Sequence, residues 1–354
     1  MQNPSVILHG PHEAYVEDRP IPVLSETNDV IVRIAYVGVC GSDVHFWNHG
    51  GPLSKVAEPL VMGHEAAGIV HAVGPSVTNL SPGDRVALEP GVPCRKCGDC
   101  KAGSYQICRK MVFAASPPHP GTLTKYYASS ADYCYKIPES MSLQEAVLME
   151  PLAVGVHAAR LAGVHFGHKV IVFGAGTVGL FCAAAARHFG ARLVLSVDIL
   201  ENKLAVAKTV VGADIGRTAM PVASLTSEEN ARLLIETYGL GDGADIVIDA
   251  SGAEASVNTG IFLLRSRGVY VQVGMGRRSV NFPIAEICNR EIIVKGSFRY
   301  GAGDFETAMD LVGSGLINLK PFITKVFPFD QAIDAWKTTG RGEGIKNIIE
   351  GPKE

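Results

Sequence analysis

The stretch that decides the fold is Lys169-Val-Ile-Val-Phe173, then Gly174-Ala-Gly176-Thr-Val-Gly179, an apolar helix-like run, and Leu193-Val-Leu-Ser-Val-Asp198. This order predicts a strand, a glycine-rich turn, a helix and a second strand, the opening of a doubly wound parallel sheet. Gly174 permits the tight turn, Gly176 lets backbone N–H groups approach a pyrophosphate, and Gly179 lets the helix pack closely on the strand. A glycine triplet also occurs in turns without a ligand, but the agreement of all four elements favours a dinucleotide site.

Asp198 ends the second predicted strand, where its carboxylate can accept hydrogen bonds from both hydroxyls of an adenosine ribose. Its charge repels the extra phosphate of NADP, so we expect NAD as the cofactor. Lys203 is the first cation after it. The other residues expected at the cofactor lie in the turn and at later strand ends, where such folds bind ligands: Thr177, Val178, Ser251, Val273, Gly274, Ser297 and Arg299.

Length and composition indicate a globular protein of two domains, since the chain has 354 residues and 47% of them are hydrophobic. The net charge of −3, with both signs spread along the chain, offers no basic stripe for nucleic acid and no polybasic membrane patch. The apolar run from Val170 to Ala186 is interrupted by glycines and fits a buried strand and helix rather than a membrane span. The N-terminus lacks a secretory signal pattern, so we expect a cytoplasmic protein.

The order of predicted elements gives the domain organisation. Short strands and glycine-rich turns, beginning with Ile31–Val39, predict a β-rich first domain over residues 1–155. Alternating helices and strands then predict a six-stranded sheet over residues 156–297. Residues 298–354 are expected to belong to the first domain again. Within the wider range 288–354, the chain is expected to return to that domain in part.

Four cysteines, Cys94, Cys97, Cys100 and Cys108, stand in one short loop. This spacing is typical of a closed tetrahedral zinc site, which stabilises a loop and has no open position for a substrate. The alternative, four reduced thiols without metal, would leave a loop rich in glycine and lysine with little to order it.

A second set of possible ligands is scattered over separate segments: Cys40, followed by Ser42 and His45; His64 and Glu65 after Gly63; and Glu150, amid apolar residues before Pro151. Thiolate, imidazole and carboxylate all bind zinc, and ligands from separate loops with room for water are typical of a catalytic site. Singly, each is ambiguous, because a lone cysteine is often a buried apolar residue and Glu150 could be an ordinary charge at a helix N-terminus.

The whole arrangement resembles the zinc-dependent medium-chain dehydrogenases over nearly the entire chain, and within them the polyol branch, which includes sorbitol and fungal xylitol dehydrogenases. Phe113–Pro118, Glu150–Leu152 and Phe298–Tyr300 match segments of that branch. The resemblance implies an α/β protein with a GroES-like β-rich catalytic domain and a Rossmann domain. It also implies a catalytic zinc on Cys40, His64 and Glu65, with Glu150 reached through water, and a second, structural zinc.

The resemblance further implies reversible NAD-dependent oxidation of a sugar alcohol to a ketose, such as xylitol to xylulose or sorbitol to fructose, in a homotetramer or a dimer. Ser42 and His45 would pass the proton to solvent. The expected substrate contacts are Phe46, Phe113, Glu150, Arg299 and Tyr300. Phe46 departs from the tyrosine usual in this branch, so the preferred polyol stays open. An arabinitol or threonine dehydrogenase would keep every ligand, and a non-catalytic NAD-binding protein is the remaining alternative.

Overall fold

The computed structural model describes residues 2–51 and 58–353. The chain forms two compact units, one of Met1–Glu150 with Phe322–Glu354 and one of Pro151–Pro321. The divisions thus lie after Glu150 and Pro321, whereas the sequence placed them after residues 155 and 297.

Helix α10 (Asp304–Gly313) explains why residues 298–321 stay in the second unit. The buried Asp304 at its start contacts α4 (Met149–Ala162), through His157 Nδ1 at 2.6 Å and Arg160 at 2.7 Å. Helix α10 is therefore tied to the second unit by a buried carboxylate with two partners.

The second unit contains a six-stranded parallel sheet with helices between its strands. In chain order its other elements are β11 (Lys169–Phe173), α5 (Thr177–His188), β12 (Leu193–Val197), α6 (Glu201–Val211), β13 (Gly216–Ala219), α7 (Ser227–Thr237), β14 (Ala244–Asp249), α8 (Glu254–Leu263), β15 (Leu264–Gln272), α9 (Ile284–Asn289) and β16 (Ile293–Gly296). The strand order β13-β12-β11-β14-β15-β16 is that of a doubly wound dinucleotide-binding sheet, so the predicted fold class is confirmed.

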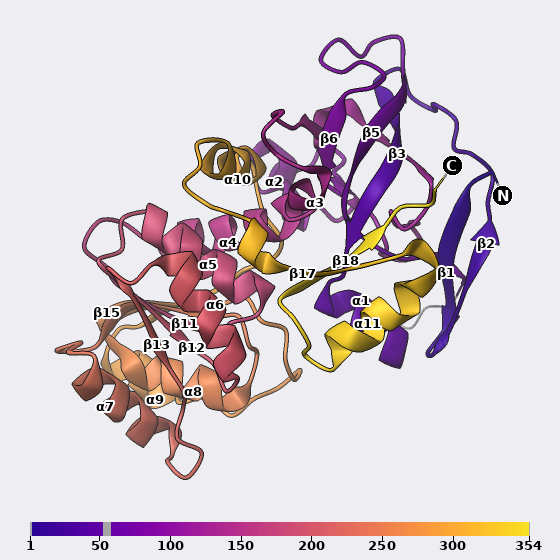
Figure 1. The fold of residues 1–354 in the computed structure, drawn as a ribbon. Helices are drawn as coiled ribbons and strands as arrows, with labels where there is room; N and C mark the ends of the chain where they lie inside the picture. Colours follow the sequence, from indigo (N-terminus) through magenta and orange to yellow (C-terminus); the bar gives the residue numbers. More distant parts are fainter. Residues whose placement is uncertain (1, 52–57, 354) are drawn as a thin grey trace. The chain divides into compact units, whose positions relative to one another are not determined.

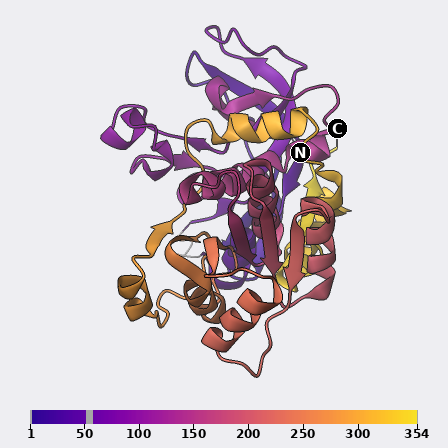
Figure 2. The ribbon, with the colours of Figure 1, turned by 90° about the vertical axis from the view of Figure 1, so that its left-hand side faces the viewer.

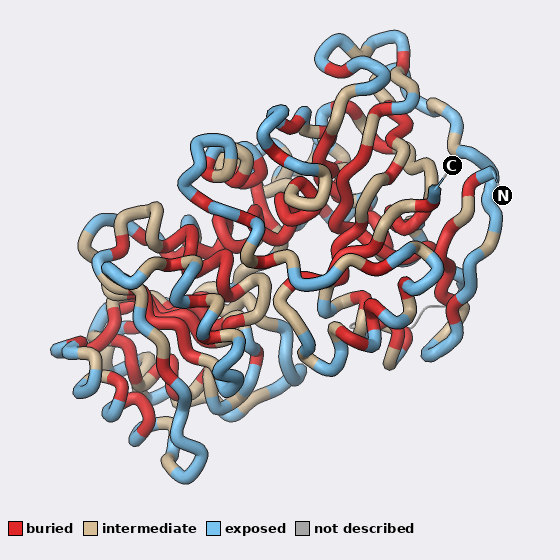
Figure 3. The backbone as a smooth tube through the Cα atoms, in the orientation of Figure 1, coloured by how far each residue is buried: buried red, intermediate tan, exposed pale blue. Residues whose placement is uncertain are grey.

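The sheet is covered on both faces, with α5 and α6 on one side and α7, α8 and α9 on the other (Figures 1 and 2). Its central strands β11 and β14 are almost entirely buried, which explains their continuous apolar sequences (Figure 3). No helix within residues 2–51 and 58–353 has both the length and the apolar character needed to cross a membrane.

The first unit is mostly β, as the sequence predicts. Its strands are β1 (Pro4–Gly10), β2 (Glu13–Asp18), β3 (Asp29–Gly38), β4 (Leu60–Val61), β5 (Glu65–Val73), β6 (Arg85–Leu88), β7 (Gly91–Val92), β8 (Val112–Phe113), β9 (Tyr126–Ser130), β10 (Cys134–Lys136), β17 (Ile323–Phe327) and β18 (Lys346–Glu350). Its helices are α1 (Gly41–His49), α2 (Gly98–Lys101), α3 (Leu143–Ala146) and α11 (Ala332–Gly340), with short 3₁₀ turns at Tyr105–Ile107, Ala131–Tyr133 and Phe329–Gln331; a further 3₁₀ turn, Lys320–Phe322, spans the division between the units.

A seven-stranded sheet dominates this unit, in the order β10-β6-β5-β3-β18-β17, with β9 also paired to β3. Strand β18, from the C-terminal end of the chain, lies antiparallel to β3, with Ile348 opposite Gly38. Strand β5 pairs with the other side of β3, with Glu65 also opposite Gly38. The ends of three strands that are distant in sequence therefore meet beside Gly38.

Candidate metal centres and dinucleotide turn

Cys40, His64 and Glu65 come together at the end of β3. One ligand atom from each lies within 4.8 Å of the others. Cys40 immediately precedes α1, and its backbone N–H donates to the Asp43 carboxylate at 2.9 Å. Glu65 is the first residue of β5, and His64 directly precedes it. Two loops fixed by paired strands thus bring the three donors together, and thiolate, imidazole and carboxylate match the donor chemistry of zinc.

The surroundings of this cluster attract a cation. Burial by itself lowers the pKa of His64, but the hydrogen bond and charge of Cys40, with the charge of Asp43, raise it to about 10. The Asp43 carboxylate is buried, and its Oδ1 lies 3.8 Å from His64 Nδ1 without a hydrogen-bond partner among the described residues. Asp43, which the sequence reasoning missed, can orient the imidazole of a metal ligand.

Lys346 on β18 is a second residue that the sequence reasoning missed. Its side chain is only 2% exposed, and its ammonium donates to both carboxylate oxygens of Glu65, at 2.8 and 2.7 Å. Burial favours the neutral amine, but the charges of Glu65 and Cys40 raise the pKa of Lys346. The Glu65 carboxylate also needs Gly38, because a Cβ there would lie 2.1 Å from Glu65 Oε2.

The other expected catalytic and substrate residues of this unit lie as follows. Glu150, in the first turn of α4, is 6% exposed, and its charge acts on His64. The Phe113 ring contacts the His64 ring, with the centroids 5.9 Å apart. Phe46 is instead packed in the apolar core of the unit. Ser42 is half-buried and His45 exposed, three residues apart and so on neighbouring positions of α1.

The four cysteines of the loop also cluster. Cys94, Cys97, Cys100 and Cys108 each place a sulfur within 4.8 Å of the others, and three of the sulfur separations are 3.9, 3.3 and 3.9 Å. Sulfurs around a tetrahedral zinc, with bonds of about 2.3 Å, are about 3.8 Å apart. Backbone N–H groups of Lys96 and Cys97 lower the pKa of Cys94 to about 6, which favours the thiolate that binds metal. This geometry fits a closed zinc site.

Glu89 links this cysteine loop to the rest of the first unit. It is fully buried, and its carboxylate accepts hydrogen bonds from Tyr105 at 2.6 Å and from Tyr135 at 2.9 Å. Tyr105 belongs to the loop, whereas Tyr135 belongs to β10. No local sequence pattern indicates this contact, since a Glu-Pro pair next to a cysteine loop is ordinary.

The glycine-rich turn of the second unit has a distinct geometry at each glycine. Gly174 has φ of 90°, in the left-handed region that glycine tolerates. A Cβ at Gly179 would lie 1.8 Å from the Gly174 carbonyl oxygen, so α5 packs directly on the turn. A Cβ at Gly176 would meet nothing within 4 Å, which leaves open space before Thr177 and Val178 at the N-terminus of α5. Backbone N–H groups at such a helix start can bind a pyrophosphate.

Asp198 follows β12 beside this turn. Its carboxylate accepts hydrogen bonds from Ala175 N at 2.6 Å and from Leu200 N at 2.9 Å. Both bonds fix the negative charge next to the glycine-rich turn. Lys203 is half-buried in the first turn of α6.

A buried aspartate organises the loops at the carboxyl edge of the sheet. Asp249 Oδ1 accepts hydrogen bonds from Ser251 N and Oγ at 2.6 and 2.9 Å, and its backbone oxygen accepts from Val273 N and Gly274 N, both at 2.8 Å. Burial raises the pKa of Asp249. Its place at the end of β14 is the signal that could have found it, because a polar residue closing an apolar strand marks the ligand edge.

The segment after β16 carries the last expected residues. Ser297 N donates to Gln272 O at 2.8 Å, and its hydroxyl is buried without a hydrogen-bond partner among the described residues. Arg299 has φ of 55° and lies over the Phe298 ring, 4.7 Å from its centroid. Tyr300 is buried against Phe305, with ring centroids 5.9 Å apart.

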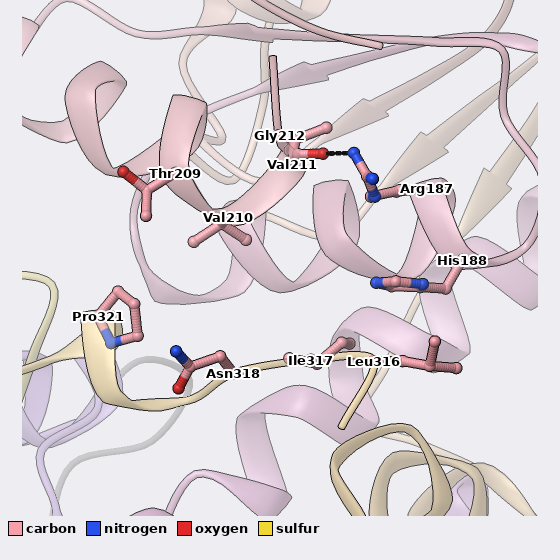
Figure 4. Close-up of a pocket in the computed structure, with 10 residues that line it drawn as sticks. All are labelled: Arg187, His188, Thr209, Val210, Val211, Gly212, Leu316, Ile317, Asn318 and Pro321. Atoms are coloured by element: carbon pink, nitrogen blue, oxygen red, sulfur yellow. Dashed lines mark hydrogen bonds between the residues drawn. The ribbon is translucent and has the colours of Figure 1, made fainter. Parts of the chain in front are cut away.

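A pocket also lies at the opposite end of α5 from the glycine-rich turn (Figure 4). Its lining includes Arg187 and His188 of α5, the end of α6, and Leu316, Ile317, Asn318 and Pro321. The Arg187 guanidinium is engaged by the Val211 carbonyl and by Asp214, at 2.6 Å. Since the 12-residue helix α5 is about 17 Å long, this pocket is separate from the dinucleotide turn.

Both units match known protein families. Residues 26–139 match the alcohol dehydrogenase GroES-like domain, and residues 177–314 match the zinc-binding dehydrogenase domain. The chain is 52% identical to a probable D-xylulose reductase A from Aspergillus clavatus, over 100% of this chain and 98% of that protein. It is also similar to L-idonate 5-dehydrogenase of Escherichia coli, with a TM-score of 0.89 and 29% identity over 98% of each chain. Galactitol-1-phosphate dehydrogenase of Escherichia coli gives a TM-score of 0.87 and 28% identity, over 98% of this chain and 99% of that one.

Proposed function

From the premise that the chain belongs to the zinc-dependent medium-chain dehydrogenases, we propose that it catalyses the reversible, NAD-dependent oxidation of a sugar alcohol to a ketose, with xylitol and D-xylulose as the leading pair. The observation that supports this proposal is the cluster of Cys40, His64 and Glu65, whose ligand atoms lie within 4.8 Å of one another, in a chain 52% identical to a probable D-xylulose reductase along its whole length.

Each unit supplies one part of the chemistry. When bound, zinc supplies a Lewis acid that acidifies the substrate hydroxyl, and NAD accepts the hydride. Cys40, His64 and Glu65 would hold the catalytic ion, with Glu150 beside it through water. The four-cysteine loop would hold a second, structural ion.

The chain's other residues have distinct proposed roles. Ser42 and His45 would move the proton from the substrate toward solvent, which the exposure of His45 supports. Phe113 would pack against the substrate chain, since its ring already contacts His64. Glu150, Arg299 and Tyr300 would contact the remaining hydroxyls, which a site needs if it is to prefer a polyol over a simple alcohol.

For the dinucleotide, Gly174, Gly176 and Gly179 would admit the pyrophosphate to the start of α5, and Asp198 would bind the ribose. The edge loops with Ser251, Val273 and Gly274, together with Ser297 and Arg299, would bind the nicotinamide half. Lys203 would lie at the ribose end.

We also propose a homotetramer, with a dimer as the alternative. Strand β16 lies at the open edge of the six-stranded sheet, and its Ile293 and Val294 are exposed. A second copy pairing with this edge would cover both side chains and satisfy the unpaired backbone groups. Light scattering of the parent and of Ile293→Lys tests this: a parent that is a monomer would contradict it.

A cytoplasmic location is proposed because thiolate metal sites persist where thiols are kept reduced.

The substrate proposal is tested by steady-state kinetics with NAD on xylitol, sorbitol, arabinitol and threonine. We expect kcat/KM to be highest for xylitol, and at least about tenfold above threonine, because threonine lacks the row of hydroxyls. Highest activity on threonine, or no activity on any polyol, would contradict the proposal.

A further inference from the structure

The ion pair of Lys346 and Glu65 has no role in the reaction described so far. Lys346 donates its three ammonium hydrogens to three acceptors: Glu65 Oε1, Glu65 Oε2 and, at 2.9 Å, the Val39 carbonyl. An ammonium has no further donors, so this lysine is fully committed. Val39 directly precedes Cys40, so Lys346 binds beside two of the three metal donors.

Several buried acidic groups lie near this pair. The buried acidic groups here are Asp43, Glu65 and Glu150, and the Cys40 thiol is next to them. Among the described residues, Lys346 is the one lysine or arginine that is buried. An unpaired buried carboxylate is strongly destabilising, because it has lost its water without gaining a partner.

Backbone pairing fixes the position of Lys346. Strand β18 pairs with β3 up to Gly38, and Val39 N donates to Asn347 O at 3.0 Å. Gly38 leaves room for the Glu65 carboxylate, since a Cβ at that position would lie 2.1 Å from Oε2. The Glu65 carboxylate is therefore held by the Lys346 ammonium, and it fits in this position because Gly38 has no side chain.

We propose that Lys346 is a positioning residue that preforms the catalytic metal site, by holding the Glu65 carboxylate in place and balancing its charge before the ion binds. This inference rests on the proposed catalytic zinc. Lys346 and the ion are two counter-ions for one carboxylate, so each matters most when the other is missing.

The test measures the melting temperature with and without the catalytic zinc, in the parent, in Lys346→Met and in Lys346→Arg. Lys325→Met is the matched control, because Lys325 is an exposed lysine on the adjacent strand β17. Dialysis against a chelator is followed by elemental analysis, and is stopped when one zinc per chain has been lost and one remains.

We expect zinc removal to lower the melting temperature of Lys346→Met by roughly 5–10 °C more than that of the parent, because Glu65 then has neither counter-ion. Lys346→Arg and Lys325→Met should respond as the parent does. A purely structural role for Lys346 would lower the melting temperature of Lys346→Met equally with and without zinc, and that result would overturn the inference.

A double variant keeps the test decisive if Lys346→Met does not fold. Glu65→Gln alone leaves the positive charge of Lys346 without the Glu65 carboxylate, whereas Glu65→Gln with Lys346→Met removes both charges. We expect the zinc-free double variant to melt at a higher temperature than zinc-free Glu65→Gln. A double variant that melts no higher would overturn the inference. If the parent itself holds no zinc at this cluster, the proposed catalytic metal fails, and the inference fails with it.

Discussion

Replacing Asp198 by Ala together with Ile199 by Arg should relax or reverse the preference for NAD over NADP. The Asp198 carboxylate is fixed beside the glycine-rich turn, because its two oxygens accept hydrogen bonds from Ala175 N and Leu200 N, at 2.6 and 2.9 Å. Ile199 is 71% exposed, so an arginine there can reach a phosphate from the solvent side without disturbing the core.

The size of the effect follows from one fixed charge. A phosphate of nearly two negative charges, about 5 Å from a half-buried carboxylate, is repelled by roughly 2–3 kcal/mol once solvent screening is allowed for. This corresponds to about 30–150-fold in affinity. The change also removes the acceptor of Ala175 N, which we expect to cost about 1–2 kcal/mol in the free energy of unfolding.

The assay is kcat/KM for NAD and for NADP with xylitol, in the parent, in the double variant and in Asp242→Ala, an exposed acid in a turn that serves as the control. The parent should prefer NAD by roughly a hundredfold, and the double variant should move the ratio toward NADP by at least about tenfold. A parent that uses both cofactors equally, or a ratio unchanged in the double variant, would show that Asp198 does not lie at the ribose.

The metal sites and the turn allow three further predictions. Elemental analysis should find two zinc ions per parent chain. Cys40→Ser should keep only the structural ion and lose turnover, whereas Cys97→Ser should lose the structural ion and melt at a lower temperature than the parent. A Cys97→Ser variant as stable as the parent would argue against a structural site. Asp43→Asn should weaken binding of the catalytic zinc by about 10–100-fold in competition with a chelator, since it alters the partner of His64, and unchanged affinity would remove Asp43 from that role. Gly179→Ala should lower the free energy of unfolding by about 1–3 kcal/mol in denaturant titrations, because its Cβ would lie 1.8 Å from the Gly174 oxygen. The same variant should bind NAD more weakly when binding is measured by fluorescence. An affinity for NAD equal to that of the parent would contradict this prediction.

The sequence determined the features whose evidence is local. The glycine-rich turn, the two strands around it and the four-cysteine loop each lie within about thirty residues, so spacing alone predicts them. The six-stranded sheet followed from alternating apolar strands and helices, and its strand order confirms the doubly wound fold. The three catalytic donors were weaker predictions, since each is ambiguous alone and only the family resemblance joined them.

Two features of the second unit have weak local signals in the sequence. Helix α9 (Ile284–Asn289) has only 6 residues, starts after a proline and buries none of its residues, so no apolar stripe marks it in the sequence. The division after Pro321 depends on Asp304 binding His157 and Arg160, more than 140 positions away, and no local pattern encodes that contact.

Only the tertiary structure decided how the metal donors are supported. Lys346 and Glu65 are separated by 281 positions, and a lysine in an apolar strand is ordinarily read as a solvent-facing residue. Its burial depends on β18 and β5 lying on opposite sides of β3, with the space above Gly38 between them. The sequence identifies metal donors by the chemistry of their side chains. The counter-ion of a buried carboxylate depends on which strands pair, and strand pairing is a property of the whole sheet.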